Sequence, residues 1–129
     1  MTIAELCLLA AVILAIATVA PAKAMGWREF DNGNPRKQSF YTPGFRSRSL
    51  GAHQNGLEIF PFFATAVVLA EMRGVPQGPI DILAVAFMCA RLVYVACYLA
   101  DQPTARSTVW AVGFVLNLAI FFSPMLVGR

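Results

Sequence analysis

Four apolar runs, each about 20 residues long, most restrict what this chain of 129 residues can fold into. They cover residues 3–22, 50–72, 80–100 and 108–127. An α-helix needs about 20 apolar residues to cross roughly 30 Å of hydrocarbon, so each run predicts a transmembrane helix. Because the runs account for nearly the whole chain, we expect a single all-α domain over residues 1–129, a bundle of four transmembrane helices.

The composition indicates a membrane protein rather than a soluble one. Apolar residues make up 58% of the chain and charged residues 13%, and the mean hydropathy is +0.64. An ordinary soluble domain has roughly 45–50% apolar and about 25% charged residues. We therefore predict an integral membrane protein in contact with membrane lipid.

The first apolar run has a second interpretation, a cleaved signal peptide. Ala22-Lys23-Ala24 follows the run and resembles a small-x-small cleavage site. A signal peptide begins with basic residues, whereas this run has none and includes Glu5. We therefore expect the run to remain as the first transmembrane helix.

The basic residues are concentrated on one side of the predicted bundle. Six lie between the first and second runs: Lys23, Arg28, Arg36, Lys37, Arg46 and Arg48. Arg106 lies between the third and fourth runs, and the opposite side has only Arg73 and Arg129. Because cytoplasmic connections accumulate Lys and Arg, we predict cytoplasmic first and third connections and both termini on the other side. The basic segment also holds Glu29 and Asp31 and has no recognition motif, so we expect no nucleic-acid partner.

Polar side chains interrupt the start of the second run: His53, Gln54, Asn55 and Glu58. An ionisable residue near the bilayer centre costs about 2.5–3.5 kcal/mol on insertion scales, so Glu58 needs a partner. At about 100° per residue, Arg48, Asn55 and Glu58 lie within roughly 80° of one another, while His53 points nearly the other way. We predict a polar face that runs inward from the basic segment.

The third run has a matching stripe. Phe87, Arg91, Tyr94 and Tyr98 recur at intervals of three or four residues, which places them within about 60° on a helix. Arg91 and Glu58 each lie roughly 15 Å below the same predicted surface, at 1.5 Å per residue. Matching depth and opposite charge predict that Arg91 is the partner of Glu58.

These groups predict a polar pocket that opens to the cytoplasm. A tight hairpin after the third run places Arg106 near the same surface. The predicted members are Arg48, Asn55, Glu58, Arg91, Tyr94, Tyr98 and Arg106. Three arginines and one carboxylate suit a small anionic ligand that also has an amino group. The same residues equally fit a structural staple, in which Glu58, Arg91 and Asn55 only join two helices.

The other polar groups within the runs are assigned to packing. We expect Asn117 to hydrogen-bond a neighbouring helix. Cys7, Cys89 and Cys97 lie inside apolar runs, and no pair has the spacing of metal ligands, so we expect packing roles and no metal site. The chain has no Ser-His-Asp set and no phosphate-binding loop, which disfavours hydrolysis and nucleotide chemistry.

Two motifs resemble the MAPEG family, the membrane-associated proteins in eicosanoid and glutathione metabolism. The resemblance covers essentially the whole chain and is closest to the small bacterial members. The first motif is Ala52-His53-x-Asn55-x-x-Glu58-x-x-Pro61-Phe62. The second is Arg91-x-x-Tyr94-x-x-x-Tyr98, followed by Arg106-Ser107. A bacterial inner-membrane location is implied by this resemblance.

The resemblance implies a homotrimer with glutathione bound as co-substrate between adjacent protomers, near the cytoplasmic face. The residues that would bind glutathione are Arg48, His53, Asn55, Glu58, Arg91, Tyr94 and Tyr98. Glu58 would lie near the amino group of glutathione, and Arg91 would support the binding residues from within the bundle. Arg106 would be the catalytic residue, because a cation beside a thiol lowers the thiol pKa.

The implied activity is that of a transferase or peroxidase acting on a lipophilic electrophile, a small molecule that enters from the lipid. The alternative is a non-catalytic scaffold or accessory subunit that binds lipid or a larger membrane complex. The chain departs from the family at Gly51, where family enzymes commonly have arginine, and at Gly56, where they often have an acidic residue. A small transporter is disfavoured because no inverted repeat is visible.

Overall fold

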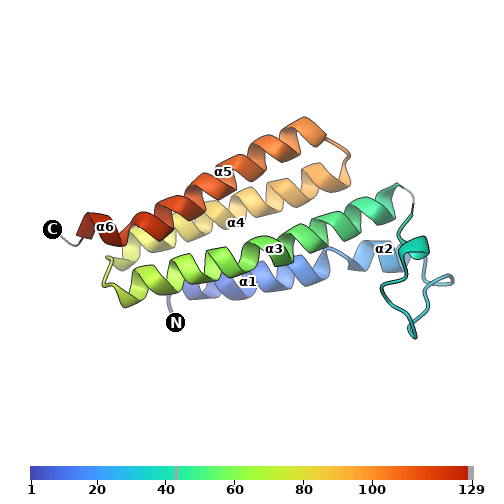
Figure 1. Ribbon diagram of the computed structural model, residues 1–129, viewed down its shortest axis with the longest axis horizontal. Helices are drawn as coiled ribbons and strands as arrows, with labels where there is room; N and C mark the ends of the chain where they lie inside the picture. Colours follow the sequence, from blue (N-terminus) through green and yellow to red (C-terminus); the bar gives the residue numbers. More distant parts are fainter. Residues whose placement is uncertain (43, 128–129) are drawn as a thin grey trace.

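Four long helices form the protein, and they run roughly side by side (Figure 1). The computed structural model describes residues 1–42 and 44–127. Within these residues there is no strand. The elements in order are α1 (Ile3–Ala17), α2 (Ala20–Met25), the 3₁₀ helix η1 (Gln38–Phe40), α3 (Phe45–Met72), α4 (Gln77–Leu99), α5 (Pro103–Phe122) and α6 (Pro124–Val127). The predicted all-α fold is confirmed.

Four segments are long and apolar enough to cross a membrane, as predicted. They are Ile3–Met25, Phe45–Met72, Gln77–Leu99 and Pro103–Val127. The first is interrupted between α1 and α2, since Pro21 has no N–H to donate to the carbonyl of Ala17. The carbonyl of Thr18, at this break, accepts a hydrogen bond of 2.6 Å from the Ser49 hydroxyl of α3.

Two predicted boundaries differ from the observed ones because polar residues extend the helices. The second apolar run begins at residue 50, and we expected Arg106 and Ser107 to begin the fourth helix, whereas α3 begins at Phe45 and α5 at Pro103. Proline suits the first turn of a helix, where an N–H is not needed. The α4–α5 turn is tight, and Asp101 has a φ of 58° there, which Asp tolerates better than most residues.

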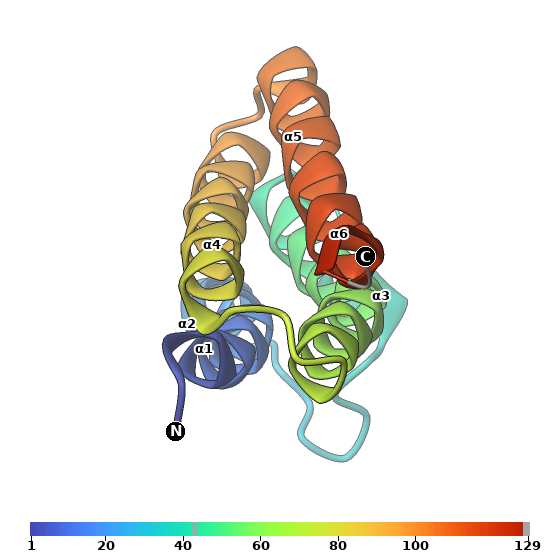
Figure 2. The same cartoon turned by 90° about the vertical axis from the view of Figure 1, so that its left-hand side faces the viewer.

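The helices form a bundle in which α3 and α4 are central. α1 packs against α3 and α4, and α5 packs against α4 and α3 (Figure 2). The segment between α2 and α3 lies at the same end as the α4–α5 turn, and the N-terminus and α6 lie at the other (Figure 1). This arrangement agrees with the predicted sidedness, but which end faces the cytoplasm stays a prediction, and Arg129 lies outside the described residues.

Small and aromatic residues form the core. The rings of Phe63 and Phe87 are stacked with their centroids 4.1 Å apart, which joins α3 to α4. Fully buried alanines, among them Ala66, Ala70 and Ala84, allow the helices to approach closely. Large apolar side chains are exposed on the outer faces, as is expected for contact with lipid or another protomer.

The N-terminus of α1 is fixed by carboxylates from the α3–α4 region. The Ala4 N–H donates to Asp81 at 2.8 Å, and the Thr2 hydroxyl donates to Glu71 at 2.9 Å. Thr2 and Glu5 also form a capping box. These bonds satisfy N–H groups that have no partner within the helix, and the negative charges favour the positive end of the helix dipole.

The segment between α2 and α3 is held against the start of α3 by Arg46. Its guanidinium donates to the Glu29 carboxylate at 2.6 Å and lies 4.9 Å from the centroid of the Phe40 ring. The Tyr41 hydroxyl donates to the Pro35 carbonyl at 2.9 Å. The basic segment is therefore folded rather than extended into solvent.

Asn117 does not make the helix–helix hydrogen bond that we expected. Its side chain on α5 is fully buried, and neither its Oδ1 nor its Nδ2 has a partner in the described part of the chain. An unpaired buried amide costs about 1–3 kcal/mol. The prediction is therefore wrong: no neighbouring helix in the described residues pairs with the Asn117 amide.

The Arg46–Glu29 contact predicts an acid-sensitive connecting segment. The hydrogen bond from Arg46 holds the pKa of Glu29 below its ordinary value of 4.5. The contact therefore stabilises the fold fully above that value, and its contribution is lost as the pH falls through the lowered pKa. Hydrogen-exchange protection of residues 26–42 is expected to fall over this acidic range. Glu29→Gln is expected to lower protection already at neutral pH, and equal protection in both proteins would contradict the assignment.

The orphaned amide predicts a stabilising substitution. Asn117→Leu keeps a side chain branched at the γ position and removes both unpaired polar atoms. It is expected to raise the free energy of unfolding by about 1–2 kcal/mol, measured by thermal unfolding in detergent. Asn117→Asp, the matched control, places a charge in the same space and is expected to destabilise. A less stable Asn117→Leu protein would show that the amide has a partner.

Candidate functional site

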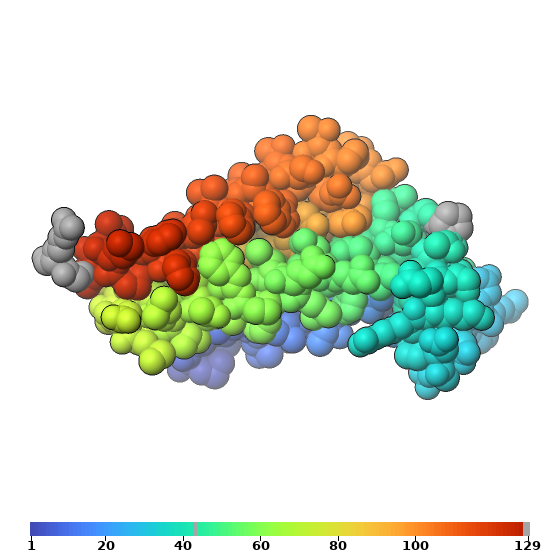
Figure 3. Space-filling view, viewed as in Figure 1, coloured from blue at the N-terminus to red at the C-terminus, as the bar shows by residue number. Residues whose placement is uncertain are grey.

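A cavity of about 380 Å³ lies between α3 on one side and α4 and α5 on the other, toward the end that holds the α4–α5 turn. The space-filling view shows α5 and α3 diverging toward this end, with α4 visible between them (Figure 3). The lining residues are Gly51, Gln54, Asn55, Glu58, Tyr94, Tyr98, Arg106, Ser107 and Trp110. Its size falls within the range of small-molecule sites, about 300–1,000 Å³.

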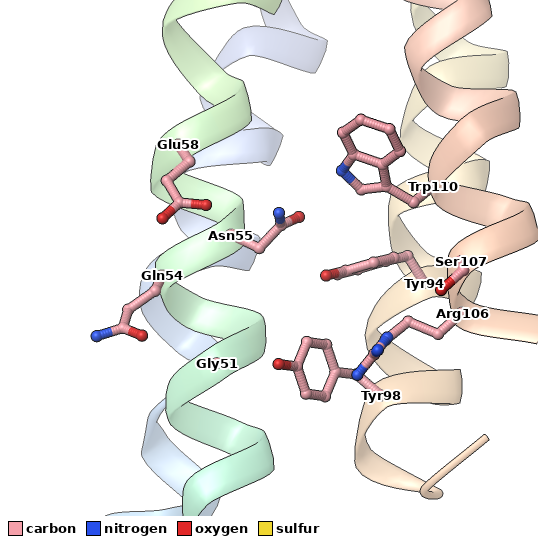
Figure 4. Close-up of a pocket in the computed structure, with 9 residues that line it drawn as sticks. All are labelled: Gly51, Gln54, Asn55, Glu58, Tyr94, Tyr98, Arg106, Ser107 and Trp110. Atoms are coloured by element: carbon pink, nitrogen blue, oxygen red, sulfur yellow. The ribbon is translucent and has the colours of Figure 1, made fainter. Parts of the chain in front are cut away.

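The α3 wall of the cavity is a single helical face. Gly51, Gln54, Asn55 and Glu58 follow one another at helical spacing, so they lie on the same side of α3 (Figure 4). Glu58 is exposed. The Oδ1 of Asn55 is buried and has no hydrogen-bond partner among the described residues. This face therefore presents the Glu58 carboxylate to the cavity, and the Asn55 side chain borders the cavity with its unpaired Oδ1 buried.

The opposite wall is aromatic and cationic. Tyr94 and Tyr98 lie one turn apart on α4, with their ring centroids 5.7 Å apart. The Arg106 guanidinium, from the first turns of α5, lies 4.4 Å from the centroid of the Tyr98 ring. Trp110 follows Arg106 by one turn (Figure 4). No carboxylate lies within ion-pair distance of Arg106 in the part of the chain that the structure describes.

Gly51 leaves the space that the Tyr98 hydroxyl fills. A Cβ atom at position 51 would lie only 2.8 Å from the Cζ of Tyr98 and closer still to its hydroxyl. Any side chain at position 51 would therefore displace Tyr98, and Tyr98 supports Arg106. Packing against Tyr98 thus explains why this chain has glycine at position 51, where family enzymes commonly have arginine.

Gly56 also has a packing reason. A Cβ atom at this position would lie 2.8 Å from the Cβ of Ala15. The glycine therefore allows α1 and α3 to approach closely. It lies away from the cavity, because α1 covers this side of α3.

Glu58 and Arg91 do not form the predicted ion pair within one chain, so this prediction is wrong. Glu58 is exposed at the cavity, whereas Arg91 is 5% exposed and faces the interior. The Arg91 guanidinium lies 4.2 Å from the centroid of the Tyr94 ring. It also borders a small space of about 10 Å³ between α1, α3 and α4, close to the minimum for one water molecule. Arg91 therefore lies behind Tyr94 and does not line the cavity.

Arg48 does not line the cavity either, contrary to our expectation. Its Nε donates to the carbonyl of Leu99 at 3.3 Å, and its guanidinium lies 3.8 Å from the Asp101 carboxylate. A cation at the C-terminal end of α4 is favoured by the helix dipole. Arg48 thus ties α3 to the α4–α5 turn, and within one chain the cavity has one arginine rather than the three expected.

His53 lies on the other side of α3. Its Nδ1 is 2.6 Å from the Ala15 carbonyl of α1, and this short contact requires Nδ1 to carry the proton. His53 lines a second cavity of about 500 Å³, together with Lys23 and Arg36. The structure therefore brings together Asn55, Glu58, Tyr94, Tyr98 and Arg106, and it separates Arg48, His53 and Arg91 from them.

Four lining residues were not predicted as members of the pocket: Gly51, Gln54, Ser107 and Trp110. Among these, Gln54 and Trp110 present large polar or aromatic side chains. Both could have been found from helical spacing. Gln54 precedes Glu58 by one turn, and Trp110 follows Arg106 by one turn. Trp110 was missed because tryptophan counts as an apolar residue on hydrophobicity scales, and we searched the apolar runs only for polar side chains.

The other candidate chemistries gain no support. The described residues contain no group of three His, Cys, Asp or Glu side chains that could hold a metal ion. The three cysteines are free: Cys7 is buried, as expected for packing, whereas Cys89 is exposed.

The fit between Gly51 and Tyr98 predicts a destabilising substitution. Gly51→Ala is expected to lower the free energy of unfolding by about 1–3 kcal/mol, because Tyr98 must move. Gly78→Ala is the matched control, since a Cβ at position 78 meets no atom within 4 Å. The control is expected to be neutral or to gain up to about 1 kcal/mol from helix propensity. Equal stability of the two variants would show that Tyr98 does not depend on Gly51.

Comparisons with known proteins give one match, to a family model. No curated protein and no solved structure gives a significant match. The model of the MAPEG family matches residues 1–126. This family includes glutathione-dependent transferases and peroxidases as well as non-catalytic members. Since the match covers nearly the whole chain, the protein belongs to the MAPEG family.

Proposed function

We propose that this protein is a glutathione-dependent transferase or peroxidase that acts on lipophilic electrophiles. The single observation that supports this function is that Glu58 and Arg106 line opposite walls of one cavity. Glutathione has an amino group, two carboxylates, amide N–H groups and a thiol, so it needs both an anionic and a cationic partner.

The lining residues fit this tripeptide group by group. The exposed Glu58 carboxylate suits the amino group of glutathione. Asn55 lines the cavity, and rotation of its amide would turn the unpaired, buried Oδ1 toward an amide N–H of glutathione. Such a bond is favourable because a buried acceptor without a donor costs about 1–3 kcal/mol. The hydroxyls of Tyr94 and Tyr98 offer further donors to its carbonyl and carboxylate oxygens.

Arg106 is proposed to stabilise the thiolate. Glutathione supplies the nucleophilic sulfur, and a guanidinium beside it lowers the thiol pKa and raises the thiolate fraction at neutral pH. No carboxylate competes for Arg106 in the described residues, and the Tyr98 ring 4.4 Å away restrains the guanidinium. The thiol proton leaves to water, which reaches the cavity through its open side.

The proposed binding site extends over two protomers of a homotrimer. Glutathione has a net negative charge, whereas one chain gives the cavity one arginine and one carboxylate. His53 lies on the opposite side of α3 beside Lys23 and Arg36. If His53 binds glutathione, it therefore does so from an adjacent protomer. Arg48 and Arg91 are proposed to act indirectly, Arg48 through the α4–α5 turn and Arg91 through Tyr94.

Calorimetry and kinetics test this function. Detergent-solubilised protein is expected to release heat on titration with glutathione and to conjugate a generic electrophile. Arg106→Ala is expected to lower kcat roughly 100- to 1,000-fold and to move the acid limb of the pH–rate profile upward, because the thiol pKa rises. Glu58→Gln is expected to weaken glutathione binding about 10- to 100-fold, without a change in melting temperature.

A matched arginine gives the control. Arg73 lies at the end of α3, far from the cavity, so Arg73→Ala is expected to change neither binding nor turnover. If the unmodified protein shows neither heat nor turnover, the catalytic proposal is refuted, and the non-catalytic scaffold or accessory subunit becomes the better assignment.

A further inference from the structure

One lining residue, Trp110, has no part in the proposed binding of glutathione. It lines the cavity, follows Arg106 by one turn of α5 and is 38% exposed. Its indole is nearly parallel to the Phe114 ring, with an interplanar angle of 8° and centroids 5.3 Å apart. Because Phe114 covers part of the indole and restrains it, Trp110 presents a fixed flat surface at the cavity.

The aromatic surface continues away from the polar groups. The Phe114 centroid lies 5.8 Å from that of Phe62 on α3, and Phe62 lies 5.8 Å from Phe121. This row joins α5 to α3 within the segments that are long and apolar enough to cross a membrane. The cavity thus has polar groups on the α3 face (Asn55 and Glu58) and an aromatic boundary at Trp110 (Figure 4).

We infer that Trp110 selects electrophiles that carry a flat aromatic ring, which stacks on the indole beside the sulfur held at Arg106. Trp110 and Arg106 both line the cavity and lie one helical turn apart on α5, so a ring on the indole lies next to the position proposed for the sulfur. Offset stacking adds roughly 0.5–1.5 kcal/mol beyond burial of apolar area, whereas an aliphatic chain gains only the burial.

This inference rests on the proposed function for its chemistry. With an aryl halide, the thiolate sulfur forms a bond to the ring carbon, and the carbon–halogen bond breaks with the electron pair leaving on the halide. The selection itself depends only on the indole surface, so ring binding can be measured without turnover.

Fluorescence provides that measurement, because the chain has two tryptophans. Trp27→Phe leaves Trp110 as the reporter, and Trp110→Phe leaves Trp27, which is 69% exposed outside the bundle. The probe is 1,3-dinitrobenzene, a flat quencher without a leaving group. Quenching of Trp110 is expected to saturate, whereas quenching of Trp27 is expected to rise linearly in the same detergent. Linear quenching of both with equal slope would overturn the inference.

Kinetics provide the second measurement. Trp110→Leu is expected to lower the ratio of kcat/KM for an aryl halide to kcat/KM for an aliphatic enone roughly 3- to 10-fold. Trp110→Phe keeps an aromatic face and is expected to retain most of that ratio. An unchanged ratio in Trp110→Leu would overturn the inference.

The two proposals fail separately. Saturable quenching in a protein without turnover would support the aromatic site and refute the transferase. Turnover together with linear quenching of Trp110 would support the transferase and refute the selection of aromatic rings.

Discussion

The candidate site depends on the position of the Tyr98 side chain. Its hydroxyl fills the space beside Gly51 on α3, its ring supports Arg106 of α5, and its edge meets Tyr94 on α4. One side chain therefore joins the three helices that enclose the cavity. Because protein interiors are close-packed, these contacts are mutually restrictive, and a shift in one of them displaces the others. The place of Arg106, the only arginine at this cavity among the described residues, follows from them.

Four arginines near this end of the bundle have separate roles. Arg46 holds the connecting segment through Glu29, and Arg48 holds the α4–α5 turn through Leu99 and Asp101. Arg91 is buried behind Tyr94, where the ring face offers a cation–π contact in place of a carboxylate. These three stabilise the structure around the cavity. Only Arg106 has its charge directed at the cavity without a carboxylate partner in the described chain, which is the condition for binding an anion.

Hydropathy was sufficient to predict the four spans, because the length of a transmembrane helix is fixed by the thickness of the bilayer. Helical spacing also predicted that Asn55 and Glu58 share a face, as do Tyr94 and Tyr98. Equal depth and opposite charge did not correctly predict the contact between Glu58 and Arg91. Two residues at the same depth meet only if each helix is rotated so that its residue faces the other. That rotation is set by packing, such as the approach of α1 to Gly56. Sequence periodicity within one helix does not specify it.

Two unpaired side-chain amides in this bundle, those of Asn117 and Asn55, have different consequences because their surroundings differ. Asn117 is fully buried among packed helices, and it lines neither the 380 Å³ cavity nor the small space beside Arg91. The Oδ1 of Asn55 is equally buried and unpaired, but the Asn55 side chain lines a cavity of about 380 Å³ beside Glu58 and opposite Arg106. An unpaired acceptor with space and complementary charges beside it can recover its hydrogen bond from a ligand. No ligand can reach Asn117 through these cavities, so its unpaired amide affects only the stability of the fold. At Asn55, a bound ligand can supply the missing hydrogen bond.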